Sequence, residues 1–214
     1  KNLNKRIQET YAKYSSATNK QALYDNYIRA FRWASDRIGE EGVIGFVTNS
    51  GWIEGYSTQG FRKSIEKEFS KIYVINLRGN QRTSGELSRK EGGKIFGSGS
   101  RVGVSITILI KSKNGVHNGE IFYYDIGDYL SRDEKLLKIS ELKSLKEISN
   151  KNLFTKIIPD EDSNWINLGD ISFSKHIAIG NKKDSGEIFI FENYSSGLKT
   201  NRDYWVYNSN KEKL

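Results

Sequence analysis

The sequence of 214 residues contains no cysteine, no methionine and only one proline. Without cysteine, disulfides, thiolate metal sites and cysteine nucleophiles are excluded. No apolar run reaches the roughly 18 residues that a membrane-spanning helix needs, and residues 1–16 lack the apolar core of a signal peptide. These absences predict a soluble protein with no membrane partner, and they are compatible with a cytoplasmic location.

The absence of methionine includes position 1, which is a lysine, so the sequence is expected to be a fragment of a longer protein. Its 36% hydrophobic and 12% aromatic residues suffice for one substantial core. The charge is unbalanced, because 34 Lys and Arg face 26 Asp and Glu and leave a formal net charge of +8. This balance favours nucleic acid or an anionic surface over an acidic substrate, although charge alone does not separate a nucleic-acid binder from an ordinary basic protein.

The first half of the chain predicts alternating helices and strands. Apolar residues at three- and four-residue spacing predict a helix over 20–38, and the apolar run 43–48 predicts a strand covered on both faces, as in a parallel sheet. A second helix follows, capped by Ser57 or Thr58, and leads into a strand over 72–77. This order is typical of an α/β fold with crossover connections.

The second half predicts two more strands and a helix. Residues 102–110 form an apolar and therefore interior strand, and 120–124 form a further strand, expected to be antiparallel because the link is short. A capping box at Ser131 predicts a helix over 133–148. The composition then changes to polar turns, which predicts a domain boundary between residues 148 and 149.

One stretch, Arg78–Arg101, cannot belong to the core; we call it the basic segment. It holds six glycines and six Lys or Arg against two Glu, between two apolar strands. A long connection of this kind indicates a polyanion partner, and the alternative is a solvated, disordered insertion. Its candidate DNA contacts are the cations Arg78, Arg82, Arg89, Lys90, Lys94 and Arg101, with the amides Asn80 and Gln81 as base-edge contacts.

A second candidate site lies where the strand 43–48 ends, because open α/β sheets bind ligands outside the carboxyl ends of their strands. Thr48, Asn49 and Trp52 could form a pocket edge there. The alternative is that Trp52 anchors the core and Asn49 only makes the turn. The two histidines lack metal-ligand spacing, so no metal site is predicted.

Four segments in order resemble a known family: LYDNYIRAFRWASDRI, GEEGVIGFVTNSGWI, FRKSIEKEFSKIYVINL and VGVSITILIKS. They are similar to the carboxyl half of the catalytic domain of N6-adenine DNA methyltransferases, with Asn49 where proline is usual. The basic segment, GDYLSRDEKL and GLKTNRDYWVYN resemble Type ISP restriction-modification polypeptides more specifically. Those polypeptides combine a nuclease, a helicase-like translocase, an adenine methyltransferase and a target-recognition domain.

The resemblance implies an α/β fold with a partial Rossmann-like methyltransferase sheet over 1–148, then a smaller mixed α+β segment over 149–214 that begins the recognition domain. It implies S-adenosylmethionine as the parent's cofactor, with ATP and Mg²⁺ if the helicase and nuclease domains are present. The implied partners are duplex DNA and the remaining domains. Asp25 and Tyr27 would lie on a helix that supports the catalytic loop, and Lys199, Asn201 and Arg202 would contact DNA.

The resemblance assigns no catalytic residue to this chain, because the family's Asn-Pro-Pro-Tyr motif and its cofactor-binding glycine motif lie upstream. The fragment itself is therefore not expected to be catalytic. Two other readings stay open: a non-catalytic DNA-binding or specificity module, and an unrelated nucleotide-binding α/β enzyme. For Asp25 and Tyr27, a helix start and an apolar helix face are explanations that need no function.

Overall fold

The computed structural model describes residues 2–97, 99–113, 119–167, 176–177, 179–180, 188–191 and 195. The chain divides into two compact units, Lys1–Leu168 and Gly169–Leu214. Every helix and strand named below belongs to the first unit. Within the described ranges, no helix combines the length and the apolarity needed to cross a bilayer.

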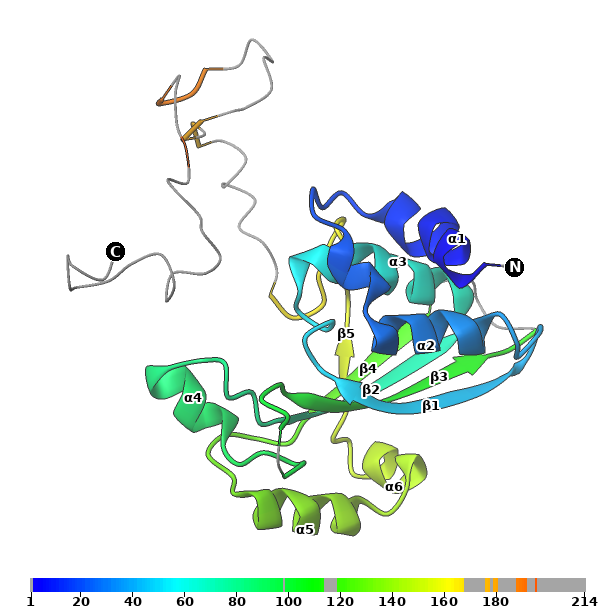
Figure 1. Ribbon diagram of the computed structural model, residues 1–214. Helices are drawn as coiled ribbons and strands as arrows, with labels where there is room; N and C mark the ends of the chain where they lie inside the picture. Colours follow the sequence, from blue (N-terminus) through cyan, green and yellow to red (C-terminus); the bar gives the residue numbers. More distant parts are fainter. Residues whose placement is uncertain are drawn as a thin grey trace, which may run out of the picture. The chain divides into compact units, whose positions relative to one another are not determined.

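A five-stranded mixed sheet in the order β1-β3-β2-β4-β5 forms the centre of the first unit (Figure 1). The strands are β1 (Gly42–Asn49), β2 (Lys71–Arg78), β3 (Val104–Lys111), β4 (Glu120–Asp125) and β5 (Thr155–Ile157). β3 lies between β1 and β2 and is antiparallel to both, whereas β4 is parallel to β2 and antiparallel to β5. The predicted α/β class is confirmed.

Helices lie on both sides of this sheet (Figure 1). One face carries α1 (Leu3–Ile7), a π-helical turn (Gln8–Ala12), 3₁₀ turns (Gln21–Tyr24 and Tyr56–Thr58), α2 (Asn26–Ser35) and α3 (Gln59–Glu68). The other side carries α5 (Arg132–Leu142) and α6 (Leu145–Asn150), and α4 (Gly85–Glu91) lies beyond the ends of the strands.

Aromatic rings form the centre of the larger core, between the sheet and α2 and α3. Trp52 contacts Phe61 with ring centroids 5.2 Å apart, and Phe61 contacts Phe31 at 5.1 Å. Trp165, far along the chain, packs edge-on against Trp52 at 5.3 Å. Because such rings bury large apolar areas, they tie three distant parts of the sequence into one core. A second, smaller core lies between the opposite face of the sheet and α5 and α6.

Of the two helices predicted for the first half, the second is present at α3. The first, predicted over 20–38, is shorter, because Asp25 has an extended backbone that separates the 3₁₀ turn Gln21–Tyr24 from α2. Thr58 is the N-cap residue of α3, but its hydroxyl donates to the carbonyls of Trp52 (3.0 Å) and Gly55 (2.8 Å) instead of capping the helix. The threonine therefore stabilises the preceding turn.

The prediction that the strand over 43–48 is covered on both faces was wrong. β1 is at the edge of the sheet and pairs only with β3 among the described strands. Val43 and Val47 are 64% and 53% exposed, whereas Ile44 on the opposite face is buried. Apolar content alone did not reveal which face is covered, because β-branched residues suit either a buried or an exposed strand position.

Two predictions for the second half also need correction. β4 runs antiparallel to β3, as expected, but it forms no hydrogen-bonded pair with β3; it pairs in parallel with β2. The capping box at Ser131 is confirmed, yet the expected single helix is divided into α5 and α6. The division occurs at Lys143, whose φ of +53° cannot continue a right-handed helix, and Ser144 caps α6.

The division between the two compact units falls between Leu168 and Gly169. The predicted division into a methyltransferase part and a recognition part after residue 148 stays a prediction. Residues after 148 still belong to the first unit, because β5 extends the sheet and Trp165 is buried in the larger core. The polar residues around Pro159 thus mark a connection over the surface of the first unit.

Candidate nucleic-acid interface

Three connections lie at the end of the sheet where β1, β2 and β4 finish. These strands point the same way, so their last residues Asn49, Arg78 and Asp125 lie at the same end of the sheet as Val104, the first residue of β3. The backbone N–H of Ser50 donates to the carbonyl of Gly103 at 2.9 Å and joins the first connection to the residues that directly follow the basic segment. The basic segment and the Thr48–Trp52 turn are therefore neighbours, as expected for a site at the carboxyl ends of strands.

The basic segment is a folded structure in its described residues. It contains α4, and the backbone N–H of Gly79 donates to the carbonyl of Glu91 at 3.0 Å, across the segment. Near its two ends, the backbone N–H of Gln81 donates to the carbonyl of Arg101 at 2.9 Å, and the Arg101 guanidinium donates back to the carbonyl of Gln81 at 3.0 Å. These bonds close the segment on itself and argue against the alternative of a disordered insertion.

Arg78 serves the fold. Its guanidinium donates to Asp125 at 2.7 Å and pairs with Asp128, so it joins the end of β2 to the connection after β4. Burial lowers the pKa of Arg78, but the bond to Asp125 and the two carboxylate charges outweigh burial and raise it overall. With two carboxylates beside it, Arg78 is poorly placed to attract a phosphate.

The amides Asn80 and Gln81 are also used within the segment. Asn80 accepts a hydrogen bond from the backbone N–H of Arg82 at 3.0 Å, and Gln81 donates to the carbonyl of Gly92 at 3.0 Å. The Asn80 bond makes a turn of the kind that Asn favours, whereas the Gln81 bond crosses the segment to the residue after α4. Their prediction as base contacts stays a prediction.

The remaining cations of the segment are available to solvent. Arg82, Arg89 and Arg101 are exposed, and Lys90 and Lys94 are half-buried. Arg89 pairs with Glu86 at 3.1 Å, but both side chains are largely exposed, so this pair contributes little and can yield to a phosphate.

The sequence interpretation missed an aromatic in this segment. Phe96 is 52% exposed, and Leu87 on α4 is 65% exposed. Single apolar side chains are common at protein surfaces, so exposure alone does not mark a binding surface, but the flat ring of Phe96 is accessible for stacking. The available signal was the IF pair in KIFGSG, which counting charges alone did not weigh.

The predicted pocket edge is mostly structural. Trp52 is fully buried in the aromatic core, which is the alternative that the sequence had left open. Asn49 accepts a hydrogen bond from the backbone N–H of Gly51 at 2.7 Å, as a turn residue does, and the Thr48 hydroxyl contacts the carbonyl of Asn49 at 3.3 Å. Trp52 is therefore a core residue, whereas Thr48 and Asn49 are half-buried and their role at a pocket edge stays a prediction.

The other predicted residues lie elsewhere. Asp25 is exposed at the N-cap of α2 without a side-chain capping bond, and Tyr27 is half-buried against the larger core, where burial raises its pKa to about 12. Lys199, Asn201 and Arg202 lie outside the described residues. Within the described ranges, no group of three or more His, Asp or Glu side chains is arranged to hold a metal ion.

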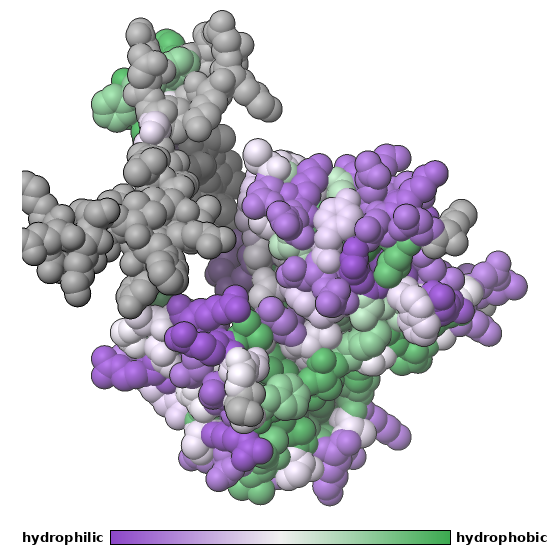
Figure 2. All heavy atoms as spheres, viewed as in Figure 1, coloured by the Kyte–Doolittle hydropathy of each residue, from purple (hydrophilic) through white to green (hydrophobic). Residues whose placement is uncertain are grey.

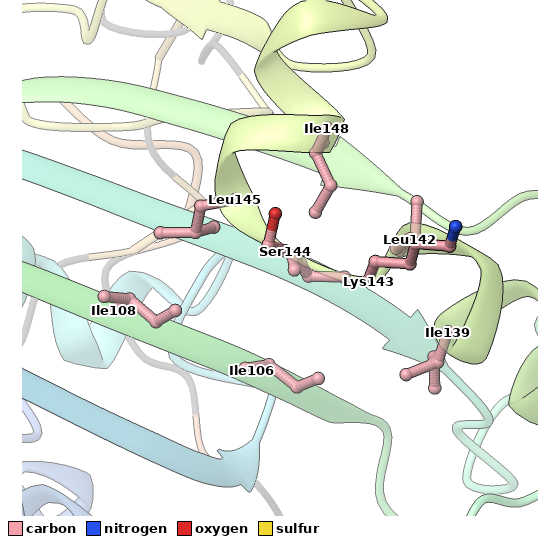
Figure 3. A pocket seen from close by; sticks show the side chains of 9 residues that line it. Ile106, Ile108, Ile139, Leu142, Lys143, Ser144, Leu145 and Ile148 are labelled. Carbon is pink, nitrogen blue, oxygen red and sulfur yellow. The ribbon is translucent and has the colours of Figure 1, made fainter.

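The face of the sheet opposite α2 is apolar. Figure 2 shows apolar residues gathered between the sheet and the helices α5 and α6. Here a cavity of about 200 Å³ lies where α5 gives way to α6, lined by Ile106 and Ile108 of β3 together with Leu142, Leu145 and Ile148 (Figure 3). Lys143 is the one cation of a lining that is otherwise almost wholly apolar, so the cavity differs in its chemistry from the basic segment.

A strap over residues 160–167 is fixed to α3 by two charged side chains. Arg62, fully buried, donates to the carbonyls of Ser163 (2.7 Å), Trp52 (2.8 Å) and Gly55 (2.7 Å). One turn further along α3, Glu66 accepts from the Trp165 indole N–H at 2.6 Å. The chain that leads out of the first unit is therefore tied to the turn that follows β1.

Comparison with known proteins gives similar structures only, since no family model and no curated protein matches the chain. The ATP-dependent Type ISP restriction-modification enzyme LlaBIII bound to DNA is 45% identical over 95% of this chain, with a TM-score of 0.87. A nuclease-deletion mutant of the Type ISP enzyme LlaGI, in complex with a DNA substrate mimic, is 45% identical over 95%, with a TM-score of 0.83. A DrdV–DNA complex is 34% identical over 99%, with a TM-score of 0.85.

The chain spans only part of each of these proteins. It covers 13% of the LlaBIII chain, 16% of the LlaGI chain and 21% of the DrdV chain. The similarity therefore concerns one region of much longer polypeptides.

Proposed function

Because the chain is a segment of a Type ISP restriction-modification enzyme, we propose that its basic segment binds duplex DNA beside the adenine-methylating centre of the parent. One observation carries this proposal: the solvent-accessible cations Arg82, Arg89, Lys90 and Lys94 lie on a folded segment at the carboxyl edge of an α/β sheet. The DNA in all three similar structures supports the choice of polyanion.

The catalytic part of the proposal concerns the longer polypeptide. There, S-adenosylmethionine would supply the methyl group for the exocyclic amine of a flipped adenine, and ATP would drive a helicase-like translocase. Trp52 is buried in the core, and we assign the residues around it no step of the transfer. We propose that residues 149–214 lead into the recognition domain, with Lys199, Asn201 and Arg202 as DNA contacts.

Phe96 suits contact with a nucleobase. A flipped base needs a flat apolar surface to stack on, and such stacking is worth about 1–3 kcal/mol per base. An aromatic ring that is half exposed on a cationic segment provides that surface. Replacing Phe96 with Ala is expected to weaken binding to a duplex with an unpaired adenine more than binding to a fully paired duplex.

The DNA interface is tested by fluorescence anisotropy with a labelled duplex at several salt concentrations. Replacing Arg82, Arg89, Lys90 and Lys94 with Ala should raise Kd and flatten the dependence of log K on log salt by about 0.9 for each phosphate that the variant no longer neutralises. A control variant with Ala at the exposed Lys5, Lys13, Lys67 and Lys71 removes the same four charges from other parts of the first unit. Equal salt slopes in both variants would overturn the assignment.

A further inference from the structure

A buried lysine of α5 holds the end of the basic segment. Lys135 has 0% of its surface exposed, and its ammonium group donates to the carbonyls of Glu91 and Gly93, each at 2.7 Å. Burial lowers the pKa of Lys135, and the Glu91 carboxylate partly opposes this effect. A lysine is rarely fully buried unless its charge is satisfied, and here the two carbonyl oxygens satisfy the ammonium group of Lys135.

The turn between these two carbonyls is pressed against the start of α5. Gly92 has a φ of +65°, and a Cβ atom there would lie 2.1 Å from the carbonyl oxygen of Leu130. A Cβ on Gly93 would lie 2.4 Å from the backbone nitrogen of Arg132. The backbone N–H of Gly93 also donates to the Leu130 carbonyl at 2.8 Å. Only glycine permits this close approach of the two backbones.

Glu91 links the turn at Gly92 and Gly93 to the first residues of the basic segment. The carbonyl oxygen of Glu91 accepts from the ammonium group of Lys135 and also from the backbone N–H of Gly79. The carboxylate of Glu91 accepts from the backbone N–H of Asn80 at 2.8 Å. The neighbouring Lys90 carbonyl accepts from the backbone N–H of Tyr129 at 3.1 Å. The first residues of the segment and the end of α4 thus share one anchor.

We propose that Lys135 is a positioning residue, which orders the cations of the basic segment for DNA without touching DNA itself. This inference rests on the proposed function. A segment that is ordered before binding loses less conformational entropy on binding, so its affinity is higher for the same contacts. Lys135 cannot reach a phosphate, because its ammonium group is enclosed by the backbone carbonyls that it holds.

The test compares two lysines of α5 in the complete 214-residue chain. Lys135→Met removes the anchor, whereas Lys138→Met removes the same charge from the next turn, where the ammonium group donates to the Ile126 carbonyl outside the basic segment. In anisotropy titrations with a labelled duplex, Lys135→Met is expected to raise Kd about five- to tenfold and leave the salt slope unchanged. Lys138→Met is expected to change Kd less than about twofold.

Hydrogen exchange separates positioning from general destabilisation. In free Lys135→Met, amides over residues 79–93 are expected to exchange faster, while amides of β2 and β3 keep their protection. An unchanged Kd would overturn the proposal. A flattened salt slope would also overturn it, because Lys135 would then be a phosphate contact.

A second pair of variants changes glycines of the basic segment instead of the lysine of α5 that holds it. Gly92→Ala forces a clash with Leu130, whereas Gly85→Ala introduces a side chain at a similar φ of +62° with no atom within 4 Å. These two variants also decide the question if Lys135→Met does not fold. The proposal is supported if Gly92→Ala raises Kd at an unchanged salt slope and Gly85→Ala does not, and it is overturned if both variants have equal Kd values. The proposed function fails separately, if the wild-type chain shows no salt-dependent duplex binding.

Discussion

Replacing Arg62 with Met tests how the strap over residues 160–167 is fixed to the first unit. The substitution keeps an unbranched side chain but removes the donors to the carbonyls of Trp52, Gly55 and Ser163. These oxygens lie around a side chain with 0% exposure, so water cannot easily replace the guanidinium. We expect the folded state to lose stability and the strap to loosen first.

Two opposing effects set the size of this loss. Each hydrogen bond to a charged donor is worth about 1.5–3 kcal/mol, and three short ones disappear. Against this, burial lowers the pKa of Arg62 to about 10, well below the usual value of an arginine. Methionine relieves that unfavourable burial of charge, which is worth roughly 3 kcal/mol at about 1.4 kcal/mol per pKa unit. The net loss is about 2–6 kcal/mol, a large part of a typical folding free energy of about 5–15 kcal/mol.

Urea unfolding followed by tryptophan fluorescence measures this loss, because Trp52 and Trp165 lie in the core next to Arg62. Lys67→Met on the same helix is the control, since it removes an equal charge from an exposed side chain whose ammonium group lies 4.0 Å from the centroid of the Tyr14 ring. The control is expected to lose less than about 1 kcal/mol. A loss below about 1 kcal/mol for Arg62→Met would refute the reasoning.

Two further predictions concern caps and charges. Ser131→Ala removes the N-cap of α5 and is expected to lower the unfolding free energy by about 1 kcal/mol. Ser140→Ala, whose hydroxyl donates to the Leu137 carbonyl of the same helix, should be nearly neutral, and urea midpoints of the two variants decide. Asp36 lies between two arginines, and although burial alone would raise its pKa, their bonds and charges lower it below 3.8. Its contribution to stability is therefore complete above pH 3.8 and is lost as the pH falls through the lower folded-state pKa. Asp36→Asn should flatten the decline of Tm below about pH 4, and an unchanged dependence of Tm on pH would contradict this.

Local patterns in the sequence predicted the helices well. The apolar spacing of Phe61 and Ile65 defines α3, and the Ser131 capping box marks the start of α5, because both signals lie within a few neighbouring residues. Strand partners depend on residues far away. The position of β3 between β1 and β2, and the parallel pairing of β4 with β2, could not be read from the runs of apolar residues.

The candidate interface shows the same limit. Its location in the basic segment followed from composition, but the roles of individual cations depended on their surroundings. Arg78 is held by Asp125 and Asp128, which come after a different strand, and the anchoring Lys135 looks like any surface lysine of a helix. Spacing within the segment carries no information about these partners.

The strand order also constrains how the chain can fold during synthesis. β1 and β2 are synthesised before β3 but do not pair with each other, because β3 lies between them in the sheet. The sheet can therefore form only after the whole basic segment has been made, and until then the apolar edges of β1 and β2 are unprotected. Pairings between residues distant in sequence fold slowly and expose such edges to aggregation. A translational pause within the basic segment would prolong this exposure, whereas a pause after β3 would leave the three strands free to pair.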